Sequence, residues 1–255
     1  MRKIITAGIF WCFFISSVLP QDREFSGGHF LKRVEYNLLL LYDLYNLNSK
    51  GDVEKLFFGD FNSPVEFSFL PSSEAAFVEQ PSGFRIVKDT SNISGILEVK
   101  YISNYPEANR EASKKYPSIG VSISEASSMT DSLRNQIREH NRTAFGKRNE
   151  EMLKLFKVEI LTLPVSNQFV EKMYEKMVLF IDNFKAKGVP PIISDGYRVV
   201  FRNVVEDEVW SLNIHMPQGD ALKMADLCRQ IITDAKENQL DEAKYISVLE
   251  TFEYK

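Results

Sequence analysis

The clearest alternation of apolar and polar positions in the chain lies between residues 197 and 216. Two segments, Tyr197–Asn203 and Val209–Met216, alternate in this way on either side of an acidic loop at 206–208. Because successive residues of a strand point to opposite faces, the pattern predicts a β-hairpin with one apolar and one polar face. Pairing Phe201 with Leu212 sorts both strands in this way, and a slip of one residue would destroy the sorting.

An amphipathic helix is predicted to cover the apolar face of this hairpin. Residues 217–220 break the second strand, and apolar residues then recur at helical spacing as far as Ala235. Cys228 lies on the apolar stripe of this helix, so we expect its thiol to be buried and chemically inert.

Shorter strands and helices are predicted along the rest of the chain. Strands are expected at 65–70, 84–88, 96–102 and 158–163, with Arg85, Glu98 and Lys100 facing outward, and 119–123 is expected to be extended. Helices are expected at 30–47, 107–115 and 241–251, and after Ser166 as far as Gly188. Between 129 and 156 we expect two helices with an exposed joint at 138–149, because this stretch has little apolar content and contains Gly146.

These elements predict an α+β fold in which antiparallel hairpins and their sheet pack against amphipathic helices. The joint divides the chain into a signal peptide at 1–20, an N-terminal α+β half at 21–150 and a C-terminal βαββα half at 151–255, with one continuous domain as the alternative. The turns before the two hairpins read Ser-Gly-Phe-Arg and Asp-Gly-Tyr-Arg. The halves are therefore either related by duplication or alike because this order suits a hairpin.

The N-terminus has the layout of a secretory signal peptide. Arg2 and Lys3 precede a near-continuous apolar run from Ile4 to Val18, with small residues before Pro20. A membrane anchor is the alternative, but this run is shorter than the roughly 20 residues that a spanning helix needs. The sequence therefore predicts an extracytoplasmic protein, in the periplasm, at the cell surface or secreted, whose mature chain has no transmembrane segment.

The net charge of the chain argues against one class of partner, and its cysteine content argues against one source of stability. Removing Arg2 and Lys3 changes the formal net charge from −4 to −6, and no basic patch stands out in the sequence, so we expect no nucleic acid partner.

Removing Cys12 leaves Cys228 alone, which excludes an internal disulfide in the mature chain. Stability must then come from a packed core, which a chain of 255 residues can build.

The usual signatures of catalysis and cofactor binding are missing from the sequence. The 3 histidines are not at ligand spacing, and the chain has no Cys-x-x-Cys pair, nucleophile elbow, phosphate loop or dinucleotide fingerprint. We therefore expect no cofactor and no metal, and assign no catalytic residue. Paired carboxylates need only proximity in space, so a hydrolase is not excluded.

The polar face of the hairpin is the one candidate binding site. Arg198, Arg202, Asn213 and His215 share this face with Ser211. Two arginines can hold a carboxylate or phosphate, and the amide and hydroxyl add neutral donors. The alternative is a solvated sheet face without a ligand.

Taken together, these features favour a secreted or periplasmic, non-catalytic binding or interaction module. Its partner would be a protein or a small anionic ligand. Two alternatives are an extracytoplasmic hydrolase with dispersed carboxylates and a structural component of an envelope assembly. In the assembly, the leucine-rich segment around Leu38–Leu41 would be the docking surface.

Overall fold

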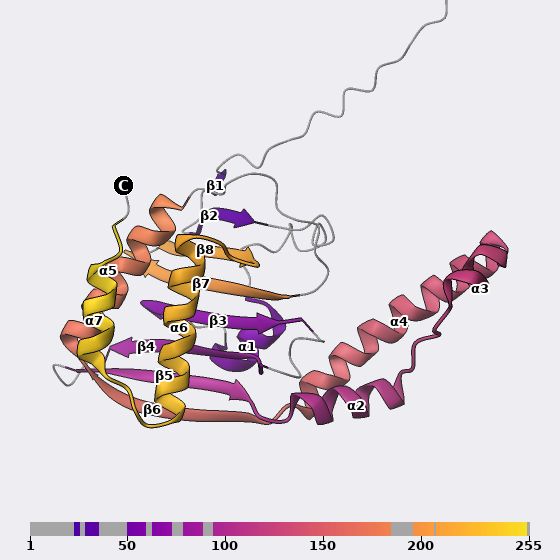
Figure 1. The fold of residues 1–255 in the computed structure, drawn as a ribbon, viewed down its shortest axis with the longest axis horizontal. Helices are drawn as coiled ribbons and strands as arrows, with labels where there is room; N and C mark the ends of the chain where they lie inside the picture. The colour runs from indigo at the N-terminus through magenta and orange to yellow at the C-terminus, as the bar shows by residue number, and fades with distance from the viewer. Residues whose placement is uncertain are drawn as a thin grey trace, which may run out of the picture.

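A computed structural model describes residues 23–25, 29–35, 50–59, 63–72, 79–88, 94–184, 196–206 and 208–253. The predicted α+β class is confirmed. Its sheet has the strand order β1-β2-β8-β7-β3-β4-β5-β6 (Figure 1). Neighbouring strands are antiparallel except β2 and β8, which run parallel. The strand bounds are β1 Arg23–Phe25, β2 His29–Glu35, β3 Val65–Pro71, β4 Ser82–Lys88, β5 Ser94–Ile102, β6 Val158–Ser166, β7 Tyr197–Val205 and β8 Glu208–His215.

The register predicted for the β7–β8 hairpin is confirmed. Phe201 pairs with Leu212, and Arg202 pairs with Ser211. The apolar side chains of both strands therefore share one face of the sheet. Phe201 and Leu212 are fully buried there.

Three helices cover the apolar face of the sheet (Figure 1). They are α5 Asn167–Asn183, α6 Asp220–Lys236 and α7 Glu242–Glu250. Ser166 caps α5 by accepting a hydrogen bond from the Phe169 N–H, and Asp241 caps α7 in the same way through Lys244. Cys228 is 0% exposed on α6, as predicted. Burying this face supplies the main apolar core.

A short helix, α1 Asp52–Phe58, covers part of the opposite face of the sheet. Phe57 and Phe58 are buried in a second, smaller apolar cluster with Ile102, Tyr105 and Met152. The expectation that Arg85, Glu98 and Lys100 face outward is therefore corrected, because Arg85 and Lys100 reach the last carbonyls of α1 and Glu98 binds both of these cations.

A helical arm projects from one end of the sheet (Figure 1). It consists of α2 Tyr105–Lys115, α3 Ile123–Ser128 and α4 Asp131–Leu155. The expected joint at 138–149 is wrong, because α4 is one continuous helix of 25 residues. In the segment expected to be extended, residues 119–122 belong to no helix or strand, Ser122 has an extended backbone, and Ile123 begins α3.

The helix expected at 30–47 is wrong at its start. Residues 30–35 belong to β2, which pairs with β8, and residues 36–49, including the leucine-rich segment, lie outside the described residues.

Strands from both predicted halves alternate in one sheet, since β3 lies between β7 and β4, and β5 pairs with β6. Division of the chain near residue 150 and duplication of the hairpins both stay predictions. Within the described residues, no helix combines the length and apolar character needed to cross a membrane.

Candidate functional site

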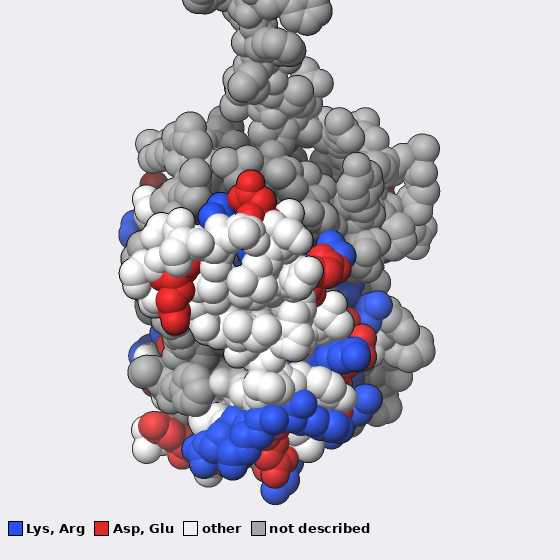
Figure 2. Space-filling view, turned by 90° about the vertical axis from the view of Figure 1, so that its right-hand side faces the viewer, with Lys and Arg blue, Asp and Glu red and all other residues white. Residues whose placement is uncertain are grey.

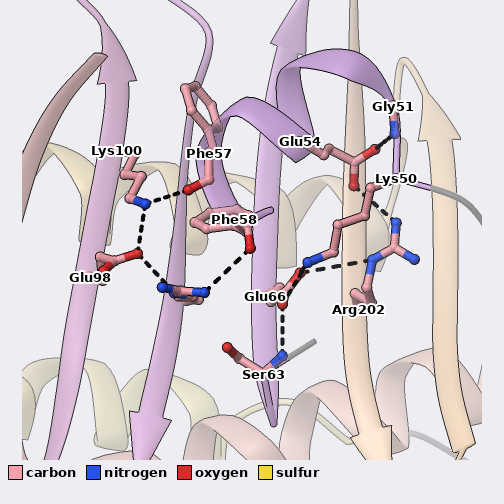
Figure 3. Close-up of polar contacts among 11 residues, drawn as sticks. Lys50, Gly51, Glu54, Phe57, Phe58, Ser63, Glu66, Glu98, Lys100 and Arg202 are labelled. Atoms are coloured by element: carbon pink, nitrogen blue, oxygen red, sulfur yellow. Dashed lines mark hydrogen bonds and ion pairs between the residues drawn. The ribbon is translucent and has the colours of Figure 1, made fainter. Parts of the chain in front are cut away.

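Charged side chains lie between α1 and the polar face of the sheet, and they form the first candidate site (Figure 3). Lys50, just before α1, lies 2.9 Å from a carboxylate oxygen of Glu66 on β3. Arg202 on β7 donates to Glu54 on α1 at 3.0 Å and lies 3.9 Å from Glu66. These four side chains are all at most 7% exposed, and we call them the buried charge network.

Backbone groups complete the buried charge network. The N–H of Gly51, the N-cap residue of α1, donates to Glu54 at 3.1 Å, and the Ser63 N–H donates to Glu66 at 2.7 Å. Burial lowers the pKa of Lys50, although the neighbouring Glu66 carboxylate opposes this effect. With two cations and two carboxylates, the network is neutral overall, which reduces the cost of taking its charges out of water.

A second group of charges lies under the C-terminal end of α1 (Figure 3). Glu98 lies 2.8 Å from Arg85 and 3.1 Å from Lys100. Lys100 also donates to the Phe57 carbonyl, and Arg85 donates to the Phe58 carbonyl at 3.5 Å. Cations are favourable here because the last carbonyls of a helix carry partial negative charge.

The Phe58 ring lies between the two groups of charges and contacts cations of both. Lys50, Arg85 and Lys100 lie 5.7, 5.8 and 5.9 Å from its centroid, within the range of a cation–π contact. The ring therefore separates the two groups while remaining in contact with cations from both.

The four residues predicted to bind an anion all lie on the polar face, but their surroundings differ. Arg202 is committed to Glu54 and Glu66 with a side chain that is 4% exposed, so an anion would have to displace a carboxylate. Arg198 pairs with His215 across the hairpin, as the register predicted, and its guanidinium lies beside Gly51. Asn213 is half-buried opposite Val200. Anion binding by this set stays a prediction.

Sequence reasoning missed most of the buried charge network. Glu66 alternates with Val65 and Phe67, as it would on a solvated face. Nothing in this pattern indicates that Lys50 and Glu54 come from a separate segment to cover the face. One signal was present in the sequence, because the neighbouring strands β7, β3 and β4 all carry charged side chains on the polar face. Burying such charges without partners is costly, so a segment that covers this face must supply charged partners.

The arm is the second candidate site. Of the residues of α4, all of which the structure describes, Ala144 and Met152 are the buried ones. Phe145 on the same helix is 59% exposed, and Leu133 is 44% exposed. Five Lys or Arg residues and two Asp or Glu residues lie between 131 and 148. Figure 2 views the end of the molecule where the arm lies and shows Lys and Arg side chains gathered in a band there.

Polar contacts tie α4 to the segment that follows α2. The Asn141 amide donates to the Ile119 carbonyl at 2.9 Å and accepts from the Ile119 N–H at 2.8 Å. Arg148 donates to the Tyr116 carbonyl at 3.2 Å and to the Ser118 hydroxyl at 2.7 Å. Phe145, four residues after Asn141, lies beside these contacts on α4, and its ring is 59% exposed.

A third feature is an open hollow of about 450 Å³ beside α7. It is lined by Ser166, Gln168, Glu242, Ala243, Ile246, Ser247 and Glu250. The Ser166 N–H donates to Glu242 at 3.0 Å, and the Ser166 hydroxyl donates to the same carboxylate. We call this feature the α7 hollow.

Comparison with known proteins adds no assignment. No protein-family model, curated protein or solved structure matches the chain. Within the described residues, no group of three or more His, Cys, Asp or Glu side chains could hold a metal ion.

Proposed function

We propose that the protein is an exported, non-catalytic interaction module that presents its arm to a protein partner. The observation that carries this proposal is the combination of a 25-residue helix with two buried side chains and a phenylalanine ring that is 59% exposed. Large aromatic rings are enriched in protein interfaces and contribute much of their binding energy. A partner that covered this ring would gain the favourable burial of its apolar area.

The described charges of the polar face support the same proposal. The buried charge network satisfies its own carboxylates and cations, so its members are engaged in holding α1 on the sheet. The hydrolase alternative needs two carboxylates that face an open cleft. Glu54 and Glu66 both contact Arg202 but are buried and bound to cations, so this pair does not face an open cleft.

Site-specific photo-crosslinking in the native host tests the proposal. A photoreactive phenylalanine analogue at position 145 should give a discrete crosslinked product, because the side chain would lie in the interface. The control position is Lys223, which is exposed on α6 away from the arm. Equal crosslinking profiles at 145 and 223 would refute the arm as a docking element.

Export is part of the proposal and has its own test. The layout of the first 20 residues supports it. N-terminal sequencing of protein from the extracytoplasmic fraction should find a start between about residues 16 and 26, as that layout implies. An intact Met1 on soluble cytoplasmic protein would contradict export.

A further inference from the structure

The strand β6 is the last strand of the sheet on the side of β5, so one of its sides is an edge. Among the described residues, β5 is the only strand that pairs with it. Figure 1 shows β6 at the end of the sheet, with the arm rising away from it. Sheet edges expose backbone N–H and C=O groups that can pair with another strand.

Two hydrogen bonds show which backbone groups of β6 face this edge. Ile102 pairs with Val158 but donates its N–H at 3.0 Å to the Pro81 carbonyl, on the β4 side of β5. Ser103 donates in the other direction, to the Lys157 carbonyl at 3.0 Å. Because backbone groups alternate in direction along a strand, residues 157, 159, 161, 163 and 165 face β5. The backbone groups of residues 158, 160, 162 and 164 therefore face the edge.

A short run of N–H groups on this edge has no hydrogen-bond partner among the described residues. These groups belong to Val158, Ile160 and Thr162. The run is closed at one end, because Pro164 has no N–H and the Ser166 N–H donates to Glu242 at 3.0 Å. It is closed at the other end as well, because the Phe156 N–H donates to the Met152 carbonyl in α4. We call the run 158–162 the open edge.

The side chains of the open edge favour strand pairing. Val158, Ile160 and Thr162 are all β-branched, a class that is enriched in strands. Ile160 is 56% exposed. Edge strands are often protected from pairing by a charge at such positions, and none of these three positions is charged. The charge of β6 is Glu159, which points to the other face of the sheet and accepts from the Ser103 hydroxyl at 3.1 Å.

We propose that the open edge of one copy of this chain pairs antiparallel with the open edge of a second copy. The two-fold axis lies between the two Ile160 residues. Each Ile160 donates its N–H to the carbonyl of the other, and Val158 of each copy pairs with Thr162 of the second copy in the same way. The two sheets thereby join into one. This surface is separate from the arm, so the inference goes beyond the proposed function and does not depend on it.

The closed ends of the open edge are what point to a second copy. Pro164 lies as far after Ile160 as Phe156 lies before it, so the two-fold register sets these two residues opposite each other. Pro164 has no N–H, and the Phe156 N–H is already bonded within α4. The register therefore gives every free N–H of the open edge a carbonyl and sets one closed end against the other. The open edge is complementary to itself, which an unrelated strand need not be.

Sedimentation velocity of the purified protein at rising concentration tests the inference. We expect a monomer–dimer equilibrium with nothing larger, because a two-fold contact uses the same surface on both copies and closes. Ile160→Pro removes the central N–H and should sediment as a monomer. The fold should tolerate this change, because the N–H at 160 takes no part in pairing with β5 and Pro164 occupies an equivalent position on the same edge. Ile160→Val is the matched control, since it keeps the N–H and the β-branched side chain and should dimerise like the wild type.

A charge exchange at position 160 gives the sharpest result, because in the proposed register this residue faces itself. Ile160→Lys and Ile160→Glu should each be monomeric alone, since like charges directly opposite each other are destabilising. An equimolar mixture should form a dimer with one copy of each, and added salt should weaken that dimer by screening the new ion pair. The wild-type dimer should persist in the same salt, because backbone hydrogen bonds and apolar side chains hold it. Circular dichroism spectra that match the wild type would establish that all variants are folded.

Three outcomes would overturn the inference. They are a wild-type protein that stays monomeric up to its solubility limit, an Ile160→Pro variant that still dimerises, and a mixture of the two charge variants that does not pair. A crosslink from a photoreactive residue at position 160 to a different protein, together with a monomeric wild type, would assign the open edge to a strand of that protein and remove the second copy as its partner.

Discussion

Replacing Arg202 with methionine should be among the most destabilising single changes on the polar face of the sheet. The side chain is 4% exposed and donates to Glu54 at 3.0 Å. At that distance and an effective dielectric constant of about 20, the lost attraction is about 5 kcal/mol. Two effects offset part of this loss. Removing the guanidinium also removes the cost of taking it out of water, and the methionine side chain fills part of the space. The net loss should be about 3–5 kcal/mol, the usual result of leaving a buried charge without its partner.

Urea denaturation is the appropriate assay, because guanidinium chloride would screen the charges under study. The midpoint should fall with little change in slope, which would assign the effect to stability rather than to the unfolded state. Arg142→Met is the matched control. It removes an arginine of the same length that also contacts a glutamate, but the side chain is 76% exposed, so the cost should be at most about 0.5 kcal/mol.

A double-mutant cycle separates the charge from the packing. Glu54→Gln keeps an oxygen for the Gly51 N–H while removing the negative charge. Combined with Arg202→Met, it leaves the neutral pair of Lys50 and Glu66, so the double variant should be more stable than the sum of the single losses by about 0.5–3 kcal/mol. Strict additivity, or an Arg202→Met loss as small as that of Arg142→Met, would refute the account of a coupled network.

Three further predictions concern other parts of the fold. Burial raises the pKa of the Cys228 thiol, so a thiol reagent should label it only after denaturation, and Cys228→Ala should cost roughly 1 kcal/mol. Burial also raises the pKa of Asp234, but hydrogen bonds from Tyr245, Gln230 and Lys244 outweigh this effect and hold that pKa below its usual value. The stability from this carboxylate is therefore present above its unfolded-state pKa and lost as the pH falls through the lower folded-state pKa. Tyr245→Phe should cost about 1.5–3 kcal/mol in neutral urea denaturation and less in acid. Gly146→Ala should stabilise the protein by about 0.5–1 kcal/mol, because an added Cβ meets nothing within 4 Å and alanine favours the continuous helix, and no gain in thermal melting would contradict that helix.

The register of the β7–β8 hairpin could be predicted because it depends only on the pattern of apolar and polar residues in two strands that are adjacent in the sequence. Two alternating strands of matching length leave one register that puts all apolar side chains on one face, and Phe201 opposite Leu212 is that register. The covering helix follows from the same logic, since its apolar stripe has helical spacing and ends near Ala235. Local pattern and tertiary contact agree here, as they do for Ser166 as the cap of α5.

Two elements could not be predicted because apolar content was used as the guide. Residues 138–149 are poor in apolar side chains, which resembled a break between helices. Arg, Lys, Glu and Gln are nevertheless strong helix formers, and polar contacts from Asn141 and Arg148 to the segment after α2 hold the helix. The strand at 30–35 owes its conformation to pairing with β8, a partner far away in the sequence.

The candidate site was predicted at the level of the face but not of its contents. Arg202 and Ser211 were placed opposite each other on the polar face, and the structure has them so. Covering that face by α1 depends on a seven-residue helix that would not be stable alone. No pattern within the helix indicates where it packs, so the partners of Arg202 could not be found from its own strand.

The charges under α1 fit one direction of that helix and not the reverse. Glu54 in the first turn lies over Arg202, while the carbonyls of the last turn lie over Arg85 and Lys100. Within the two groups of charges, the four cations Lys50, Arg85, Lys100 and Arg202 meet three carboxylates, Glu54, Glu66 and Glu98. The additional cation is compensated by the partial negative charge of those carbonyls. Reversing α1 would take Glu54 away from Arg202 and would bring the N–H groups of its first turn, which carry partial positive charge, to Arg85 and Lys100. The polar face therefore does more than tolerate a covering helix, because its charge pattern selects the orientation in which α1 can pack.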